Sequence, residues 1–218
     1  MRLIEPLETL QIRLAHVYWL GGSPCAGKSS IADLLAERYG MRIYRCDDAF
    51  YRHRDLITPA EQPVFYRLMQ LSSEDLWMRP VVQQTAEEIE IYREEFGLIL
   101  ADLLAMDGSH PILAEGAALL PELIGPLIAN PRRAIWVVPA PDFQLYHYSR
   151  REWTHEILKD CSDPQQAFSN WMDRDIAFAR FAAADAQSRG LHVLVVDGQQ
   201  SIAHNADTVD QWLSVGAA

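Results

Sequence analysis

The sequence predicts an α/β fold, a five-stranded parallel sheet between two layers of helices. Five short runs, rich in β-branched or aromatic residues and each followed by Gly, Asp, Glu or Pro, have the character of strands: His16–Leu20, Arg42–Cys46, Pro111–Ala114, Ala134–Val138 and His192–Val196. Segments with helical periodicity separate these runs. Because strands that alternate with helices are joined by right-handed crossovers, we expect parallel strands covered on both faces.

Three helices are predicted from their periodicity and end signals. Ile31, Leu34 and Leu35 share one face of a helix that follows the first strand. A longer helix precedes the third strand, with apolar residues three or four positions apart at Ile89, Tyr92, Phe96, Ile99, Leu100, Leu103 and Leu104. Gly97 in its interior costs about 1 kcal/mol relative to Ala and marks a candidate kink. Another helix is bounded by Asp163 and Pro164 at its start and by Gly190 at its end.

Composition limits the classes of function. The chain has 218 residues, which suits one domain, and 19 Lys and Arg against 30 Asp and Glu give a net charge of −11. A surface of this sign repels nucleic acids and anionic lipids, so neither a nucleic-acid nor a membrane partner is expected. Three cysteines are too few for a disulfide framework, which favours a cytoplasmic protein.

The loop after the first strand carries the most specific motif of the chain. Its residues match G-x-x-x-x-G-K-[ST] at every fixed position and continue into a helix: Gly22, Ser23, Pro24, Cys25, Ala26, Gly27, Lys28, Ser29 and Ser30. Two glycines let the backbone curl so that its amides face a phosphate group. Lys28 is expected to bind the β- and γ-phosphates of ATP and Ser29 a Mg²⁺ ion. The alternative is a glycine-rich turn with an exposed lysine.

Carboxylates follow the second and third strands. Asp47 and Asp48 come directly after a strand that we expect beside the first, at the edge where ligands bind in open α/β sheets. One of them can accept a proton from an attacking hydroxyl or orient Mg²⁺; the alternative is a pair that caps a helix. Glu115 can hold a Mg²⁺-bound water or a substrate hydroxyl, or instead pair with a nearby arginine.

These segments together resemble a known family. The Gly22–Ser29 loop, Asp48-Ala49-Phe50-Tyr51 and Leu113-Ala114-Glu115-Gly116 are similar to P-loop small-molecule kinases of the uridine kinase, nicotinamide riboside kinase and phosphoribulokinase group. The broader set includes shikimate, gluconate and chloramphenicol kinases. The resemblance covers the core strands and loops, and it implies a P-loop NTPase fold and transfer of a phosphoryl group from ATP to a hydroxyl. It also implies that Asp48 is the catalytic base, with Asp47 one position off register.

The resemblance further implies a helical lid and an acceptor-binding insert. The lid, residues 142–185, contains Arg150 and Arg151, which are expected to bind the phosphates and assist transfer. Since neighbours on a helix point about 100° apart, at most one of the two meets the phosphates directly; the alternative is a solvated charged face. Gly198, after the fifth strand, is expected to contact the adenine.

The insert, residues 51–106, is unusually rich in aromatic and cationic side chains. Tyr51, Arg52 and Arg54 at its start are expected to bind the acceptor together with Asp48 and Glu115. Aromatic faces and arginines suit a planar, hydroxylated or anionic acceptor. The alternative is a helical subdomain in which the aromatic residues form their own core.

The sequence as a whole predicts a single kinase domain, residues 1–218, that uses ATP and Mg²⁺ and a small-molecule hydroxyl acceptor. The candidate acceptors are a nucleoside-like molecule, a sugar, a sugar acid or an antibiotic. Two other functions remain open, a regulatory P-loop NTPase without an acceptor and a toxin-like kinase of a cell-wall sugar nucleotide. The oligomeric state is left open, with a homodimer as one possibility.

Overall fold

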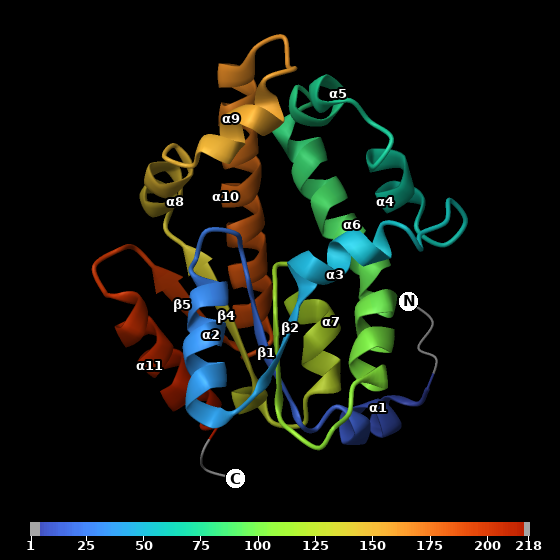
Figure 1. The fold of residues 1–218 in the computed structure, drawn as a ribbon, viewed down its shortest axis with the longest axis vertical. Helices are drawn as coiled ribbons and strands as arrows, with labels where there is room; N and C mark the ends of the chain where they lie inside the picture. Colours follow the sequence, from blue (N-terminus) through green and yellow to red (C-terminus); the bar gives the residue numbers. More distant parts are fainter. Residues whose placement is uncertain (1–4, 216–218) are drawn as a thin grey trace.

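One sheet of five parallel strands lies at the centre of the protein (Figure 1). The computed structural model describes residues 5–215, so residues 1–4 and 216–218 of the predicted domain lie outside it. The strands are β1 (Val17–Gly22), β2 (Arg42–Arg45), β3 (Ile112–Glu115), β4 (Ala134–Pro139) and β5 (His192–Val196). All four pairings are parallel, as the alternation of strands and helices predicted.

The strand order is β2-β3-β1-β4-β5. The expectation that the second strand lies beside the first is therefore wrong, because β3 pairs with both of them. Ile112 of β3 is in register with Val17 on one side and with Arg42 on the other. Where β3 ends, Gly116 approaches Cys46 so closely that a Cβ at residue 116 would lie 2.4 Å from the Cys46 Cβ. The ends of β2 and β3 thus converge.

Two helical layers cover the sheet. One contains α2 (Lys28–Tyr39) and α11 (Ile202–Leu213), which pack on Tyr18, Leu20 and Ile135. The other contains α1 (Leu7–Arg13), α6 (Val81–Ala105), α7 (Pro121–Ile124) and α10 (Pro164–Ser188), which pack on Trp19 and Trp136. Alternate residues of β1 therefore face opposite layers, as expected for a buried parallel strand.

The predicted helix ends agree with the structure. Asp163 caps α10 by accepting hydrogen bonds from two backbone amides, Pro164 occupies its first turn, and Gly190 follows its end. The long helix predicted before the third strand is α6, which continues through Gly97 without interruption. Two short 3-10 helices, Gly125–Leu127 and Pro131–Arg133, connect α7 to β4. Among the described residues, no helix combines the length and the apolar character needed to cross a membrane.

The remaining helices lie beyond the carboxyl ends of the strands (Figure 1). On one side are α3 (Cys46–His53), α4 (Pro63–Leu68) and α5 (Ser73–Trp77), and on the other are α8 (Pro141–Tyr148) and α9 (Glu152–Leu158). The two sides meet where the Trp77 ring of α5 stacks on the Trp171 ring of α10, with centroids 4.5 Å apart. The predicted insert and lid segments therefore share a small aromatic core above the sheet.

Candidate functional site

The loop between β1 and α2 is held in a conformation that requires glycine at both ends. Gly22 has a φ of +125°, and a Cβ there would lie 1.9 Å from the Val137 carbonyl oxygen. Gly27, which precedes the first residue of α2, has a φ of +79°. L-amino acids with a side chain rarely adopt either conformation. The two glycines predicted to let the chain curl are thus the residues around which it turns.

The start of α2 is suited to bind an anion. No side chain caps this helix, which leaves the amides of its first turn without side-chain acceptors. The helix dipole adds a partial positive charge at the same place. Lys28 is buried beside it and donates a hydrogen bond from Nζ to the Ser23 carbonyl oxygen, 2.6 Å away. Burial lowers the pKa of Lys28, while the Glu115 and Asp47 carboxylates partly offset this effect.

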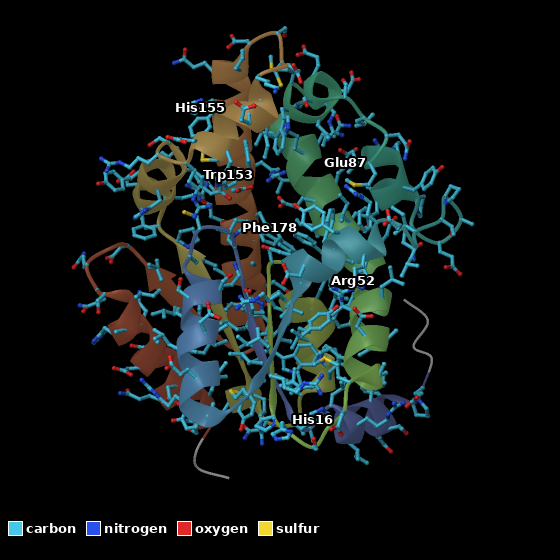
Figure 2. All side chains as sticks on the ribbon, viewed as in Figure 1. His16, Arg52, Glu87, Trp153, His155 and Phe178 are labelled. Atoms are coloured by element: carbon cyan, nitrogen blue, oxygen red, sulfur yellow. The ribbon has the colours of Figure 1, made fainter. Side chains whose placement is uncertain are left out.

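A cavity of about 660 Å³ opens over this loop, at the carboxyl edge of the sheet. Its size is that of a site for a small molecule. Residues from the loop, α3, α5, α6, the end of β3, the α8–α9 turn and α10 form its wall: Pro24, Cys25, Ala26, Gly27, Lys28, Ser29, Ser30, Cys46, Asp47, Phe50, Tyr51, Trp77, Glu88, Tyr92, Glu95, Glu115, Ala117, Ala118, Tyr148, Arg151, Trp153, Trp171 and Arg174. Figure 2 labels one residue of this wall, Trp153 of α9.

The structure separates the two aspartates that follow β2. Because α3 begins at Cys46, directly after the strand, Asp47 and Asp48 both occupy its first turn and point in different directions. Asp47 lines the cavity, and its carboxylate makes no hydrogen bond or ion pair with another described residue. Asp48 lies outside the cavity wall. The placement therefore favours Asp47 over Asp48, the reverse of the ranking from the motif.

Glu115 combines both interpretations that the sequence allowed. Its carboxylate pairs with Arg45, 3.0 Å away, and also lines the cavity near Lys28 and the Ser29 hydroxyl. Burial raises the pKa of Glu115, and the Lys28 ammonium opposes that effect. Within residues 5–215, no three His, Cys, Asp or Glu side chains form a metal-binding group. The donor set of one hydroxyl and two carboxylates, from Ser29, Asp47 and Glu115, nevertheless has the hard oxygen ligands that Mg²⁺ uses beside phosphates.

The arginines of the predicted lid have different surroundings. Arg151 lines the cavity, with Nη2 3.6 Å from the Cys25 sulfur, and forms no ion pair with a described residue. Arg150 lies outside the wall, with its guanidinium over the Tyr146 ring. Both arginines lie in the turn between α8 and α9 rather than on a helix, and of the two only Arg151 lines the cavity.

Three further residues predicted for the site do not reach the cavity. Arg52 bonds to Asp102, with 3.0 Å between Nη2 and the carboxylate, and Arg54 lies over the Tyr51 ring. Gly198 lies next to the Phe143 ring and is not part of the cavity wall. Tyr51 itself lines the cavity from its outer rim, where 64% of its surface is exposed.

The sequence interpretation missed three polar residues of α6. Glu88, Tyr92 and Glu95 line the cavity, and the Tyr92 hydroxyl donates to Glu88 over 3.1 Å. Burial raises the pKa of Glu88 to about 7, although Arg174 opposes the shift from 3.1 Å away. Their spacing of four and three residues places them on one face of the helix, next to the apolar stripe. This spacing is the signal in the sequence that could have identified them.

Behind Glu95 lies a buried histidine. Nδ1 of His53 is 2.8 Å from Glu95, and Nε2 is 3.2 Å from Asp102. Burial alone lowers the pKa of His53, but the hydrogen bonds to the two carboxylates outweigh it and the pKa is raised. When the ring is protonated, both of its nitrogens donate, one to Glu95 and one to Asp102, and these bonds hold Glu95 in place.

The fold and the cavity define an α/β protein with a candidate ligand site at the carboxyl edge of a parallel sheet, over the start of a helix. This is the general position of ligand sites in open α/β sheets. Comparison of the chain with protein-family models and with curated proteins gives no match. The residues of the cavity are therefore the basis for assigning a function.

Proposed function

We propose that the protein is an ATP-dependent kinase with a P-loop NTPase fold, which transfers the γ-phosphoryl group to a hydroxyl of a small molecule. The observation that carries the proposal is the position of buried Lys28 at the start of α2, inside a loop turned by Gly22 and Gly27, under a cavity that the Asp47 carboxylate also faces.

The loop supports the binding of a polyphosphate. Its amides and the first turn of α2 offer hydrogen-bond donors, and a phosphate oxygen replaces the Ser23 carbonyl as the partner of Lys28. Ser29 and Glu115 would hold Mg²⁺, which offsets charge on the phosphates when it is bound and leaves Asp47 to accept a proton. Arg151 adds a second cation from the α8–α9 turn. These groups stabilise the charge that develops on the phosphoryl oxygens during transfer.

Asp47 supports the acceptor half of the reaction. In the transfer, the acceptor oxygen bonds to the γ-phosphorus while the bond between that phosphorus and the β–γ bridging oxygen breaks, leaving ADP. The hydroxyl proton moves to the Asp47 carboxylate. Residues 142–185 act as the lid and residues 51–106 as the acceptor-binding insert. The stacked rings of Trp77 and Trp171 join the two segments above the sheet, and closure of the lid over bound ligands would limit access of water.

The test is ATP consumption by the purified protein with Mg²⁺ and a panel of nucleosides, sugars, sugar acids and aminoglycoside or phenicol antibiotics. Lys28→Ala is the blank, and Lys159→Ala, at an exposed lysine paired with Glu156, is the matched control. The proposal predicts that an acceptor stimulates turnover in the native and Lys159→Ala proteins only. It is overturned if no compound stimulates turnover, or if Lys28→Ala retains the stimulated rate.

A further inference from the structure

The cavity wall supplied by residues 46–95 has an unusual composition. It contains three carboxylates, Asp47, Glu88 and Glu95, four aromatic side chains and no lysine or arginine. We call this part of the cavity surface the acidic wall. Because α5, α6 and the end of α3 lie in the proposed acceptor-binding insert, residues 51–106, the acidic wall is the surface that an acceptor would contact.

The arginines of the same region are engaged elsewhere. Arg67 and Arg79 both pair with Glu87, which does not line the cavity. Arg52 pairs with Asp102, and Arg54 lies over the Tyr51 ring. The cationic residues that suggested an anionic acceptor from the sequence therefore do not face the cavity.

Two of the cations that line the cavity lie on its loop side. Lys28 and Arg151 are there, and neither forms an ion pair with a described residue. Arg174 lies against the acidic wall instead, over the Trp77 ring, and its charge is balanced by Glu88 and by Asp175, 2.6 Å away. The cavity is thus divided into a cationic end suited to phosphates and an acidic wall suited to hydrogen-bond donors.

Glu95 is the best-positioned recognition group of the acidic wall. His53 bonds to its Oε1 from behind and is itself held by Asp102, which also accepts a hydrogen bond from the Tyr44 hydroxyl at 3.0 Å. Glu88 is occupied by Arg174 and Tyr92, and Asp47 has the chemical role. Within residues 5–215, no hydrogen bond engages Oε2 of Glu95, so this oxygen is available to a ligand.

We propose that the acceptor is an uncharged or cationic polyhydroxyl compound with a planar or apolar portion, and that Glu95 determines this specificity. The inference rests on the proposed kinase function. Hydroxyl and ammonium groups donate to carboxylates, and the aromatic side chains contact the apolar portion. A carboxylate or phosphate on the acceptor would meet like charges in the acidic wall, where the adjacent Arg174 is already paired with Glu88 and Asp175. Sugar acids, nucleotides and sugar nucleotides are excluded as acceptors on this account.

The experiment measures the affinity of the protein for two series of compounds, each with members that differ in charge. The first series is glucosamine, glucose and glucuronate, and the second is cytidine and its 5′-monophosphate. Each compound is titrated by ligand-detected NMR into protein saturated with Mg²⁺ and a non-hydrolysable ATP analogue, so that the cationic end is filled. We expect an uncharged or cationic member of at least one series to bind at least about tenfold more tightly than its anionic counterpart, or 1.4 kcal/mol.

Glu95→Gln tests the assignment of specificity. It should reduce that preference at least threefold without changing the affinity for the ATP analogue. The matched control is Glu90→Gln on the same helix, because Glu90 pairs with Arg93 outside the cavity. The inference is overturned if the anionic members bind best, if no member of either series binds, or if Glu95→Gln leaves the preference intact. Failure of the kinase proposal is distinguished by the turnover assay above, in which no compound would then stimulate ATP consumption. Separate titration of the ATP analogue shows whether the cationic end is filled in these experiments.

Discussion

Asp47→Asn should lower kcat strongly and change the stability of the fold only slightly. Asp47 and Asp48 both lie in the first turn of α3, where each carboxylate stabilises the helix by about 0.3–1 kcal/mol through the dipole. Either Asn variant should therefore lower the melting temperature by no more than about 4 °C. Only Asp47 faces the cavity. Loss of a general base lowers kcat by about 10²–10⁴, or 2.7–5.5 kcal/mol of transition-state stabilisation, so Asp47→Asn should show this loss.

Asp48→Asn is the matched control, and its kcat should stay within about threefold of the native value. The assay is coupled ADP release with the acceptor found in the panel, together with nucleotide affinity and thermal melting for each variant. Affinity for the nucleotide should change little in either variant, because Lys28 and the loop amides are intact. A large loss of kcat in Asp48→Asn with a normal rate in Asp47→Asn would refute the argument from geometry and restore the assignment from the motif.

Three further predictions concern the loop, the arginines and the buried acid. Arg151→Ala should lower kcat at least tenfold while Arg150→Ala stays within about threefold, measured in the same turnover assay, because only Arg151 lines the cavity. Gly22→Ala should destabilise the fold by about 2–5 kcal/mol in urea unfolding, since its Cβ would collide with the Val137 carbonyl. Gly97→Ala should stabilise the fold by about 0.5–1 kcal/mol, because no atom lies within 4 Å of the added Cβ. Equal changes in the free energy of unfolding for the two variants would contradict both predictions. Burial raises the folded-state pKa of Glu88 to about 7, so its protonated form favours folding. The stability of the native protein relative to Glu88→Gln should therefore be greatest below about pH 4.3 and fall as pH rises through about 7; a difference constant between pH 4 and 8 would refute the shift.

Strand positions were predictable because each strand leaves a local signal. The run Ala134–Val138 is apolar at every position, and β4 is buried at every position from Ala134 to Pro139. Strand order leaves no such signal. Nothing in Arg42–Cys46 says which neighbour it pairs with, and the approach of Gly116 to Cys46 that brings β2 beside β3 is a contact over 70 positions of sequence.

The site was predictable where a fixed backbone shape demands particular residues. Gly22 and Gly27 at set positions around Lys28 indicate a turning loop, and the loop has that conformation. The choice between Asp47 and Asp48 depends on a rotation of about 100°, which is set by where α3 begins rather than by the motif.

The acidic residues of α6 were harder to identify because the helix carries so many of them. Glu87, Glu88, Glu90, Glu94 and Glu95 all fall within two and a half turns, and packing against α10 and α3 decides which of them face the cavity. The arginines of the insert misled for the same reason. Their composition suggested an anion site, but Arg67 and Arg79 each found a carboxylate partner in Glu87.

The most direct test of the account is equilibrium binding of MgATP to the native protein and to Lys28→Ala, measured by isothermal titration calorimetry. The loop should bind MgATP at a single site, and Lys28→Ala should weaken that binding at least tenfold while the Lys159→Ala control leaves it unchanged. Absence of MgATP binding to the native protein, or equal affinity in Lys28→Ala, would contradict the assignment of this loop as the nucleotide site.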